Sequence, residues 1–181
     1  MASVEDLRAF FVEQLEELQE VLQTADTHPL VGFYDGERHV DENTERNRVV
    51  DRLRDRFTAM NMPIVLEHTM ADTNRCDFTA SAMIDGRRRL LVVEAKGQWH
   101  PQLFEAASTQ LDVRYASHHD AEKQGVYLVF WYGSGTKVAD RVRHGITSPG
   151  ALKEKITSIM EAGLRGRLDV FVLDLSRRRS V

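Results

Sequence analysis

Cysteine is almost absent from this sequence, since Cys76 is the only one among 181 residues. An internal disulfide framework is therefore excluded, and a lone thiol fits a reducing compartment such as the cytoplasm. Long apolar runs are also missing, because no stretch of about 18 consecutive apolar residues occurs, and we expect no membrane-spanning helix. The N-terminus has no basic lead before its first apolar residues, so we expect no secretory signal there.

The chain also lacks a large excess of either charge, with a formal net charge of -4 at pH 7. A small net charge and 42% hydrophobic residues are typical of a globular protein. This composition excludes a chain that is disordered over its whole length. A protein that binds polyanions over its whole surface is not indicated, so any contact with nucleic acid must come from local basic clusters. Arginines cluster within residues 46–56, 87–89 and 177–179.

The order of predicted elements is typical of an α/β fold in one domain. Apolar residues at helical spacing predict helices at 4–25, 42–60, 101–118 and 149–163. Strand patterns occur at 64–70, 75–84, 87–96, 125–132 and 168–175. Asp85-Gly86 is a strong signal for a hairpin turn between the second and third of these strands.

We therefore expect a mixed β-sheet with an antiparallel hairpin, one right-handed βαβ crossover and flanking helices. The crossover should join strand 87–96 to a parallel strand at 125–132. A single domain should span residues 1–181. Its expected parts are an N-terminal amphipathic helix at 1–26, a loop at 27–41, a core at 42–175 and a basic tail at 176–181.

The predicted hairpin sets two acidic residues opposite each other. If the turn at 85–86 has two residues, counting back along both strands places Asp77 directly opposite Glu94. Side-chain alternation puts Lys96 on the same face. Opposed carboxylates repel each other, and a divalent cation between them would remove that conflict. Mg²⁺ prefers such oxygen ligands and is usually bound through one or two carboxylates plus a substrate phosphate.

This arrangement is a phosphodiester-hydrolysis site in outline, with an ammonium that can offset negative charge in the transition state. The competing interpretation is that Asp77 and Glu94 are solvated strand residues. It is disfavoured because Glu94 and Lys96 interrupt an apolar run at residues 90–93, where burial opposes charge.

Asp77 and the later Glu94-Ala95-Lys96, with a helix bearing Glu45 before them and another helix after them, resemble the PD-(D/E)xK nuclease superfamily. This superfamily has the restriction-endonuclease-like fold, and the resemblance covers residues 42–132. It is closest to nuclease-like domains of large bacterial proteins, some of which are associated with defence against phage. One departure is Cys76, which stands where the family has its namesake proline.

The resemblance implies a Mg²⁺-dependent nuclease in which Mn²⁺ can substitute for Mg²⁺. Its expected substrate is DNA, because members of the superfamily commonly cleave DNA. Asp77 and Glu94 would bind the metal and Lys96 would assist the attacking water. Glu45 would complete or order the metal site. Glu42 is its rival, although the macrodipole alone favours a carboxylate near a helix start. The resemblance is compatible with a homodimer and with a place in a larger multidomain protein.

The predicted helix at 101–118 adds two polar candidates. Gln110 and Arg114 fall on its apolar stripe, where they need partners. Gln110 could hold the strand of Lys96 or a water, and Arg114 could reach a phosphate or extend from the edge of the stripe into solvent. A Gln-x-x-x-Tyr signature known from some branches of the superfamily would need tyrosine at 114, so that role is not transferred.

Three basic residues are weaker candidates for contact with nucleic acid. His100 could touch a phosphate, or it could simply lead its helix. Arg48 and Arg52 belong to the arginine run at 46–56 and could line a nucleic-acid groove. Most arginine runs of this kind, however, form the solvated face of a helix. Two other functions stay open: a catalytically inactive nucleic-acid-binding module of the same fold, and a protein–protein adaptor that uses the N-terminal helix.

Overall fold

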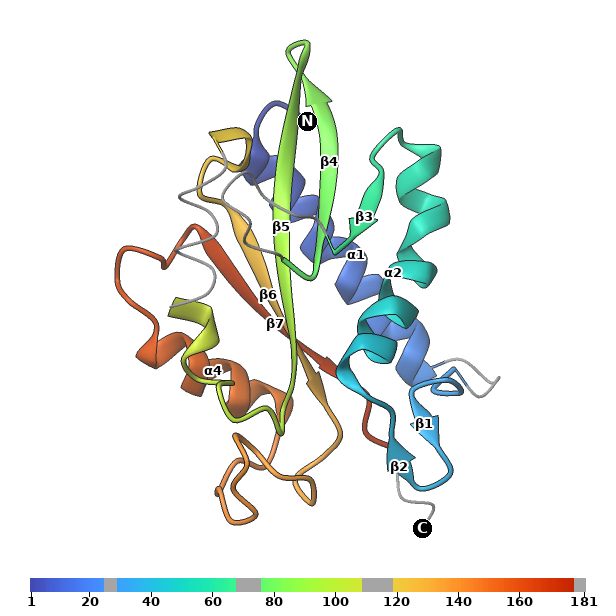
Figure 1. Ribbon diagram of the computed structural model, residues 1–181, viewed down its shortest axis with the longest axis vertical. Coiled ribbons are helices and arrows are strands. Elements are labelled where there is room, and N and C mark those ends of the chain that lie inside the picture. Colours follow the sequence, from blue (N-terminus) through green and yellow to red (C-terminus); the bar gives the residue numbers. More distant parts are fainter. Residues whose placement is uncertain (25–28, 68–75, 109–118, 178–181) are drawn as a thin grey trace.

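The computed structural model describes residues 1–24, 29–67, 76–108 and 119–177. At its centre is a five-stranded sheet in the order β3-β4-β5-β6-β7 (Figure 1). Its strands are β3 (Ile64–Leu66), β4 (Phe78–Ile84), β5 (Arg87–Gly97), β6 (Gly125–Trp131) and β7 (Leu168–Asp174). The pairs β3–β4 and β4–β5 are antiparallel, and β5–β6 and β6–β7 are parallel. The predicted α/β class with a mixed sheet is thus confirmed.

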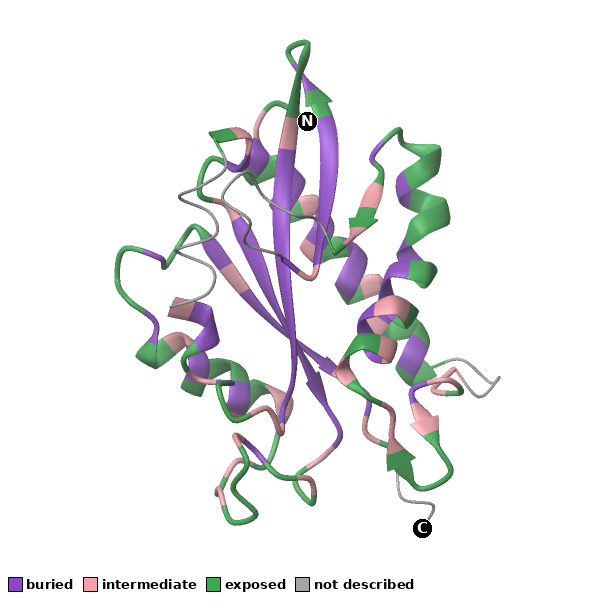
Figure 2. Ribbon diagram, in the orientation of Figure 1, coloured by how far each residue is buried: buried purple, intermediate pink, exposed green. Residues whose placement is uncertain are grey.

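Helices pack on both faces of this sheet, because neighbouring residues of each central strand are apolar on opposite sides. Val93 of β5 belongs to a core cluster with residues of α1 (Val4–Thr24) and α2 (Glu42–Ala59). Val92 belongs to a second cluster with residues of α4 (Pro149–Ile159). The strand β6 is therefore buried along its whole length, and β5 is buried from Leu90 to its end (Figure 2).

Local sequence signals account for the helix starts. The Ser3 hydroxyl accepts a hydrogen bond from the Asp6 amide before α1, and the Asp41 carboxylate accepts one from Thr44 before α2. Ser148 does the same for α4, where proline occupies the first turn. Among the helices that the structure describes, none combines the length and apolar character needed to cross a lipid bilayer.

The hairpin register is as predicted. Ile84 pairs with Arg87, and the ladder runs without interruption to the pair Phe78 and Val93. Asp85 and Gly86 both have positive φ, at 50° and 73°, as a type I′ turn requires. The β4 strand begins one residue after Asp77, so Asp77 lies at the point where the ladder ends.

Several element limits differ from the predictions. The expected loop at 27–41 contains a small antiparallel pair, β1 (Tyr34–Asp35) and β2 (Arg38–His39). The strand expected at 64–70 ends at Leu66, because Glu67 turns the backbone to a φ of 52°. Residues 68–75 lie outside the described part, so the start of the strand expected at 75–84 is described only from Cys76, two residues before β4.

The helix expected from residue 101 begins later. Residues 101–105 form hydrogen-bonded turns, in which Leu103 and Glu105 donate to carbonyls three residues earlier, and residues 106–108 are helical. The rest, residues 109–118, lies outside the described part, so the right-handed sense of the β5-to-β6 connection stays a prediction. The helix expected at 149–163 ends at Ile159, because Met160 adopts an extended conformation.

Gly97 ends β5 at a point where no side chain fits. A Cβ atom there would lie 2.4 Å from Cζ2 of Trp99. The Trp99 ring cannot easily move away, because it stacks on His39 with ring centroids 3.6 Å apart and also contacts Tyr132. Glycine at this position therefore lets the chain fold back tightly after the strand.

We predict that Gly97→Ala lowers the free energy of unfolding by about 1–3 kcal/mol, because the added methyl group overpacks the Trp99 ring. Urea denaturation monitored by circular dichroism measures this change. Gly150→Ala in α4 is the matched control, because the nearest atom outside its chain neighbours lies 3.9 Å from the added Cβ. Equal urea midpoints for the two variants would contradict the prediction.

Candidate active site

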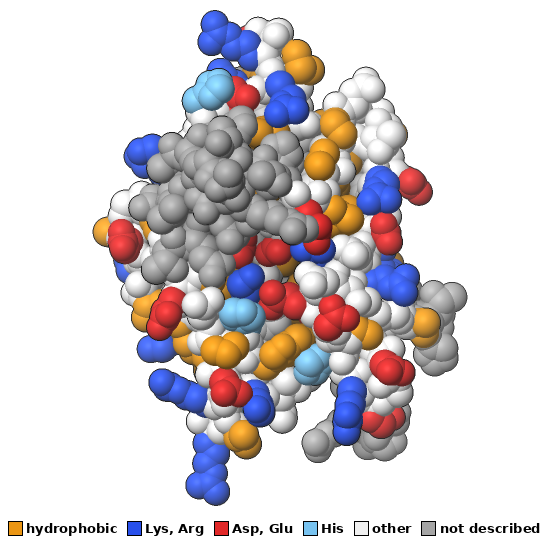
Figure 3. All heavy atoms as spheres, viewed as in Figure 1, with side chains coloured by type: hydrophobic (Ala, Val, Ile, Leu, Met, Phe, Trp, Pro, Cys, Tyr) orange, Lys and Arg blue, Asp and Glu red, His pale blue; other side chains and the backbone are white. Residues whose placement is uncertain are grey.

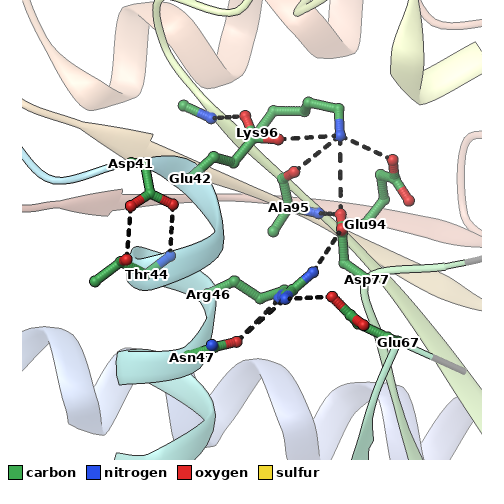
Figure 4. A network of polar contacts seen from close by, with 11 residues as sticks. Asp41, Glu42, Thr44, Arg46, Asn47, Glu67, Asp77, Glu94, Ala95 and Lys96 are labelled. Atoms are coloured by element: carbon green, nitrogen blue, oxygen red, sulfur yellow. Dashed lines mark hydrogen bonds and ion pairs between the residues drawn. The ribbon is translucent and has the colours of Figure 1, made fainter.

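A buried lysine near the end of β5 is the centre of a polar network (Figure 4). The Lys96 ammonium lies 3.0 Å from Oε1 of Glu94, 3.4 Å from Oε1 of Glu42 and 3.8 Å from Oδ2 of Asp77. Its side chain is 9% exposed. Burial by itself would lower the pKa of Lys96, but the negative charges of the neighbouring carboxylates outweigh burial and raise it. Lys96 is therefore a cation at neutral pH.

Asp77 is fixed although it lies just outside the β4 ladder. Its Oδ2 accepts a hydrogen bond of 2.8 Å from the Ala95 amide, and its Oδ1 accepts one of 3.3 Å from Arg46. Its own carbonyl accepts from the Glu67 amide at 2.7 Å. These bonds hold the carboxylate beside the strand that carries Glu94 and Lys96, as the hairpin register predicts.

The helical acid that meets Lys96 is Glu42. It is the first residue of α2, and its Oε2 accepts a 2.8 Å hydrogen bond from the Gly97 amide while Oε1 faces the ammonium. Glu42 thereby ties the start of a helix to the end of the central strand. Sequence reasoning ranked Glu45 above it, and the structure brings Glu42 to the network instead.

Arg46 is a member of the network that sequence reasoning missed. It is 5% exposed, and its guanidinium donates to Asp77, to Glu67 at 3.2 Å and to Asn47 at 3.2 Å. The available signal was its spacing, because Arg46 follows Glu42 by four residues and so lies on the same helical face. The spacing of Glu42 and Arg46 was overlooked because Arg46 also belongs to the arginine run at 46–56, and such a run is typical of a solvated surface.

Glu45 lies elsewhere, inside the core that α1 and α2 form on the sheet. It is fully buried, and neither carboxylate oxygen has a hydrogen-bond partner in the described part of the chain. Burial raises its pKa to about 9; the nearby Tyr132 hydroxyl lowers it in part, and the charges of Glu42 and Asp41 add to the rise. Glu45 is therefore protonated at neutral pH.

A protonated Glu45 explains the local bonding. The Tyr132 hydroxyl already donates its only hydrogen to the Phe33 carbonyl at 3.0 Å, so it has none for a carboxylate. A carboxylic acid can instead donate its own hydrogen to the Tyr132 oxygen. The surroundings of Glu45 therefore suit a neutral carboxylic acid better than a carboxylate.

We predict that Glu45→Gln gains stability relative to the wild type as pH rises. The raised pKa means that the folded chain keeps a proton which the unfolded chain releases near pH 4.5, so the wild type loses about 1.4 kcal/mol per pH unit from there to about pH 9. Glutamine cannot ionise and lacks this loss. Urea unfolding at about pH 5 and about pH 8 measures the difference.

Glu13→Gln is the control for this comparison, because Glu13 is exposed on α1. Its stability should follow the wild type at both pH values. Parallel pH profiles for Glu45→Gln and the wild type would show that Glu45 is ionised in the folded chain.

The weaker basic candidates lie in other surroundings. Arg52 donates to the Pro29 carbonyl at 2.7 Å and its guanidinium lies over the Phe33 ring, and Arg48 packs against Gly32. The structure thus places both against the segment at 29–33. His100 is half-buried in the turn after β5, where its Nδ1 accepts from the Gln102 amide at 3.1 Å. Gln110 and Arg114 lie outside the described residues.

Gln98 fastens a loop to the end of β5. It is fully buried, its amide nitrogen donates to the carbonyls of Gly133, Thr136 and Lys137, and its oxygen accepts from the Tyr132 amide at 2.6 Å. A buried amide with all these partners is satisfied and rigid. The loop after β6 is therefore held two residues from Lys96.

The network has the donor atoms of a Mg²⁺ site. Glu42, Asp77 and Glu94 supply carboxylate oxygens, and these acids outnumber the two cations Lys96 and Arg46 that contact them. Acidic and basic side chains gather near the middle of the face shown in Figure 3. Within residues 1–24, 29–67, 76–108 and 119–177, however, no group of three or more His, Cys, Asp or Glu is arranged to hold a metal ion.

Comparison with known proteins adds no family to these observations. No protein-family model matches the chain, and neither the curated proteins nor the solved structures searched contain a match.

Proposed function

We propose that this chain is a metal-dependent nuclease of the PD-(D/E)xK type that hydrolyses phosphodiester bonds, with DNA as its expected substrate. The observation that carries the proposal is the position of two carboxylates on one ammonium. Glu94 and Asp77 lie 3.0 Å and 3.8 Å from Lys96 Nζ, at the end of an antiparallel hairpin. Glu42 joins them from the helix that precedes the hairpin.

The sheet topology supports this assignment. A helix comes before the antiparallel pair β4–β5, and β5 then pairs in parallel with β6. This is the order expected of the restriction-endonuclease-like fold. Carboxylates near the carboxyl end of β5 also lie where α/β proteins place their ligands.

The donor chemistry of the site fits Mg²⁺ or Mn²⁺. Asp77 and Glu94 would hold the ion, in line with the preference of Mg²⁺ for one or two carboxylates completed by water and substrate phosphate. A bound ion would supply a Lewis acid for the phosphodiester. It would also balance the negative charge that the network keeps in excess of Lys96 and Arg46.

The residues of the chain itself have separable roles. Lys96 carries a positive charge at neutral pH, so it can stabilise negative charge on the phosphoryl oxygens in the transition state. Arg46 and the Ala95 amide orient Asp77, and the Gly97 amide orients Glu42. These positioning bonds come from rigid elements, as a site that binds a transition state needs.

One observation favours a second candidate, a nucleic-acid-binding module without catalysis. The Lys96 ammonium already lies among the carboxylates and neutralises part of their charge. A nuclease mechanism would require this ammonium to exchange at least one carboxylate partner for a phosphate oxygen when substrate binds. In an inactive module the ion pairs would persist and serve only stability.

We predict that the purified protein nicks supercoiled plasmid in the presence of Mg²⁺ or Mn²⁺, and that Lys96→Ala and Asp77→Asn each reduce the rate by roughly 10²–10³-fold. Agarose gels over time measure the rate. Glu94→Gln provides a third variant of similar size, and circular dichroism checks that all variants fold. Arg167→Ala, at an exposed position just before β7, is the control that keeps full activity.

The outcomes separate the candidate functions. Nicking that persists in chelator, or that survives in all the site variants, would refute the proposed mechanism. DNA binding without nicking by the wild type would favour the inactive module. Absence of both activities would favour a protein–protein adaptor.

Metal binding can be tested without substrate. We predict that millimolar Mn²⁺ raises the melting temperature, because a ligand at 100 times its Kd stabilises a fold by about 2.7 kcal/mol. Differential scanning fluorimetry measures the shift, which Asp77→Asn should abolish. Asp85→Asn in the exposed turn is the control and should keep it. An unchanged wild-type melting temperature would argue against a formed metal site.

A further inference from the structure

A groove of about 630 Å³ lies where the loop between β6 and α4 meets the start of that helix. Its lining includes Arg141, Arg143, His144 and Lys155, together with the aromatic ring of Phe104. We propose that this basic groove binds the phosphate backbone of the nucleic acid that the site cleaves. This inference rests on the proposed nuclease function and names the surface that holds its substrate.

The charged side chains that line the basic groove are all cationic. No carboxylate lines it, and among the described residues none of the ion pairs involves Arg141, Arg143 or Lys155. In contrast, Lys96 and Arg46 are both paired with acids. Unpaired cations that converge on one groove repel each other, and an anion that binds between them removes this repulsion.

His144 orders the groove through two hydrogen bonds of its ring. Its Nδ1 accepts a hydrogen bond from the Ile146 amide at 3.1 Å, so its Nε2 carries the hydrogen that reaches the Thr136 carbonyl at 3.1 Å. Both bonds are satisfied by a neutral ring. The backbone of Arg141 is also held in place, because it forms an isolated antiparallel bridge with Val138.

The basic groove is attached to the candidate active site. The amides of Ala139 and Asp140 donate to the carbonyls of Gln98 and Trp99, at 2.8 Å and 3.1 Å, and Gln98 follows Lys96 by two residues. The loop that carries Arg141 and Arg143 is the one at the lower end of Figure 1. A strand held there can continue toward Lys96.

The chemistry favours a polyanion over a small anion. A single phosphate needs one or two of these cations, whereas a nucleic-acid strand supplies a regular series of phosphates to all three. Arg141 and Arg143 suit phosphate particularly well, because guanidinium groups bind its oxygens in pairs. Contacts of this kind position the backbone and carry no sequence information, so the basic groove predicts binding without sequence preference.

The test measures binding apart from cleavage. Fluorescence anisotropy with labelled single-stranded and duplex DNA, in chelator, compares the wild type with a triple variant, Arg141→Ala/Arg143→Ala/Lys155→Ala. The matched control, Lys123→Ala/Arg165→Ala/Arg167→Ala, loses the same charge from exposed residues outside the basic groove and outside the arginine clusters of the sequence. Circular dichroism confirms that both fold, and Lys155→Glu alone serves as a less disruptive variant.

We expect the groove variant to bind at least about tenfold more weakly at low salt and the control to bind nearly as the wild type does. The slope of log affinity against log salt, taken from about 50 to about 200 mM, should fall by roughly 0.9 per lost phosphate contact on duplex DNA. Equal losses in both triple variants, or no wild-type binding at about 50 mM salt, would overturn the proposal. This experiment measures DNA binding and not nicking. The proposed groove can therefore be refuted or supported whether or not the protein proves to be a nuclease.

Discussion

The burial of the Lys96 ammonium is the constraint on which the arrangement of this molecule depends. A charge with only 9% of its side chain exposed cannot stand alone, and three acids surround it. Glu42 comes from the start of α2, Asp77 from the residue before β4, and Glu94 from β5 itself. Arg46 and two backbone amides then fix those acids. The helix, the hairpin and the central strand are joined through one side chain.

What the sequence predicted well is what depends on local geometry. The two-residue turn set the hairpin register, so the meeting of Asp77 with the strand of Glu94 and Lys96 followed from counting residues. The choice between Glu42 and Glu45 did not follow, because it depends on how α2 rotates as it packs. Glu45 does share the apolar stripe of its helix, and that stripe faces the core, whereas the candidate site meets the edge of the helix.

Three other features of the structure were not predicted, because the sequence carries little or no local pattern for them. The strands β1 and β2 have two residues each, too few for alternation to show. The Gln98 side chain binds a loop more than thirty residues away along the sequence, and a single buried amide leaves no pattern. The basic groove likewise forms only when the loop folds, because Arg141 and Lys155 belong to different elements. In the longest arginine run of the sequence, Arg46, Arg48 and Arg52 are held against other parts of the chain.

The order of the elements along the chain also bears on how the molecule assembles. Every member of the Lys96 network lies between residues 42 and 97, and the hairpin within that range closes through contacts that are near in sequence. The parallel partners β6 and β7 arrive from distant segments, which makes their pairing slow compared with that of the hairpin. The short sequence separation of the β4–β5 contacts favours a folding nucleus in this hairpin. The Lys96 network would then form before β6 and β7 complete the sheet.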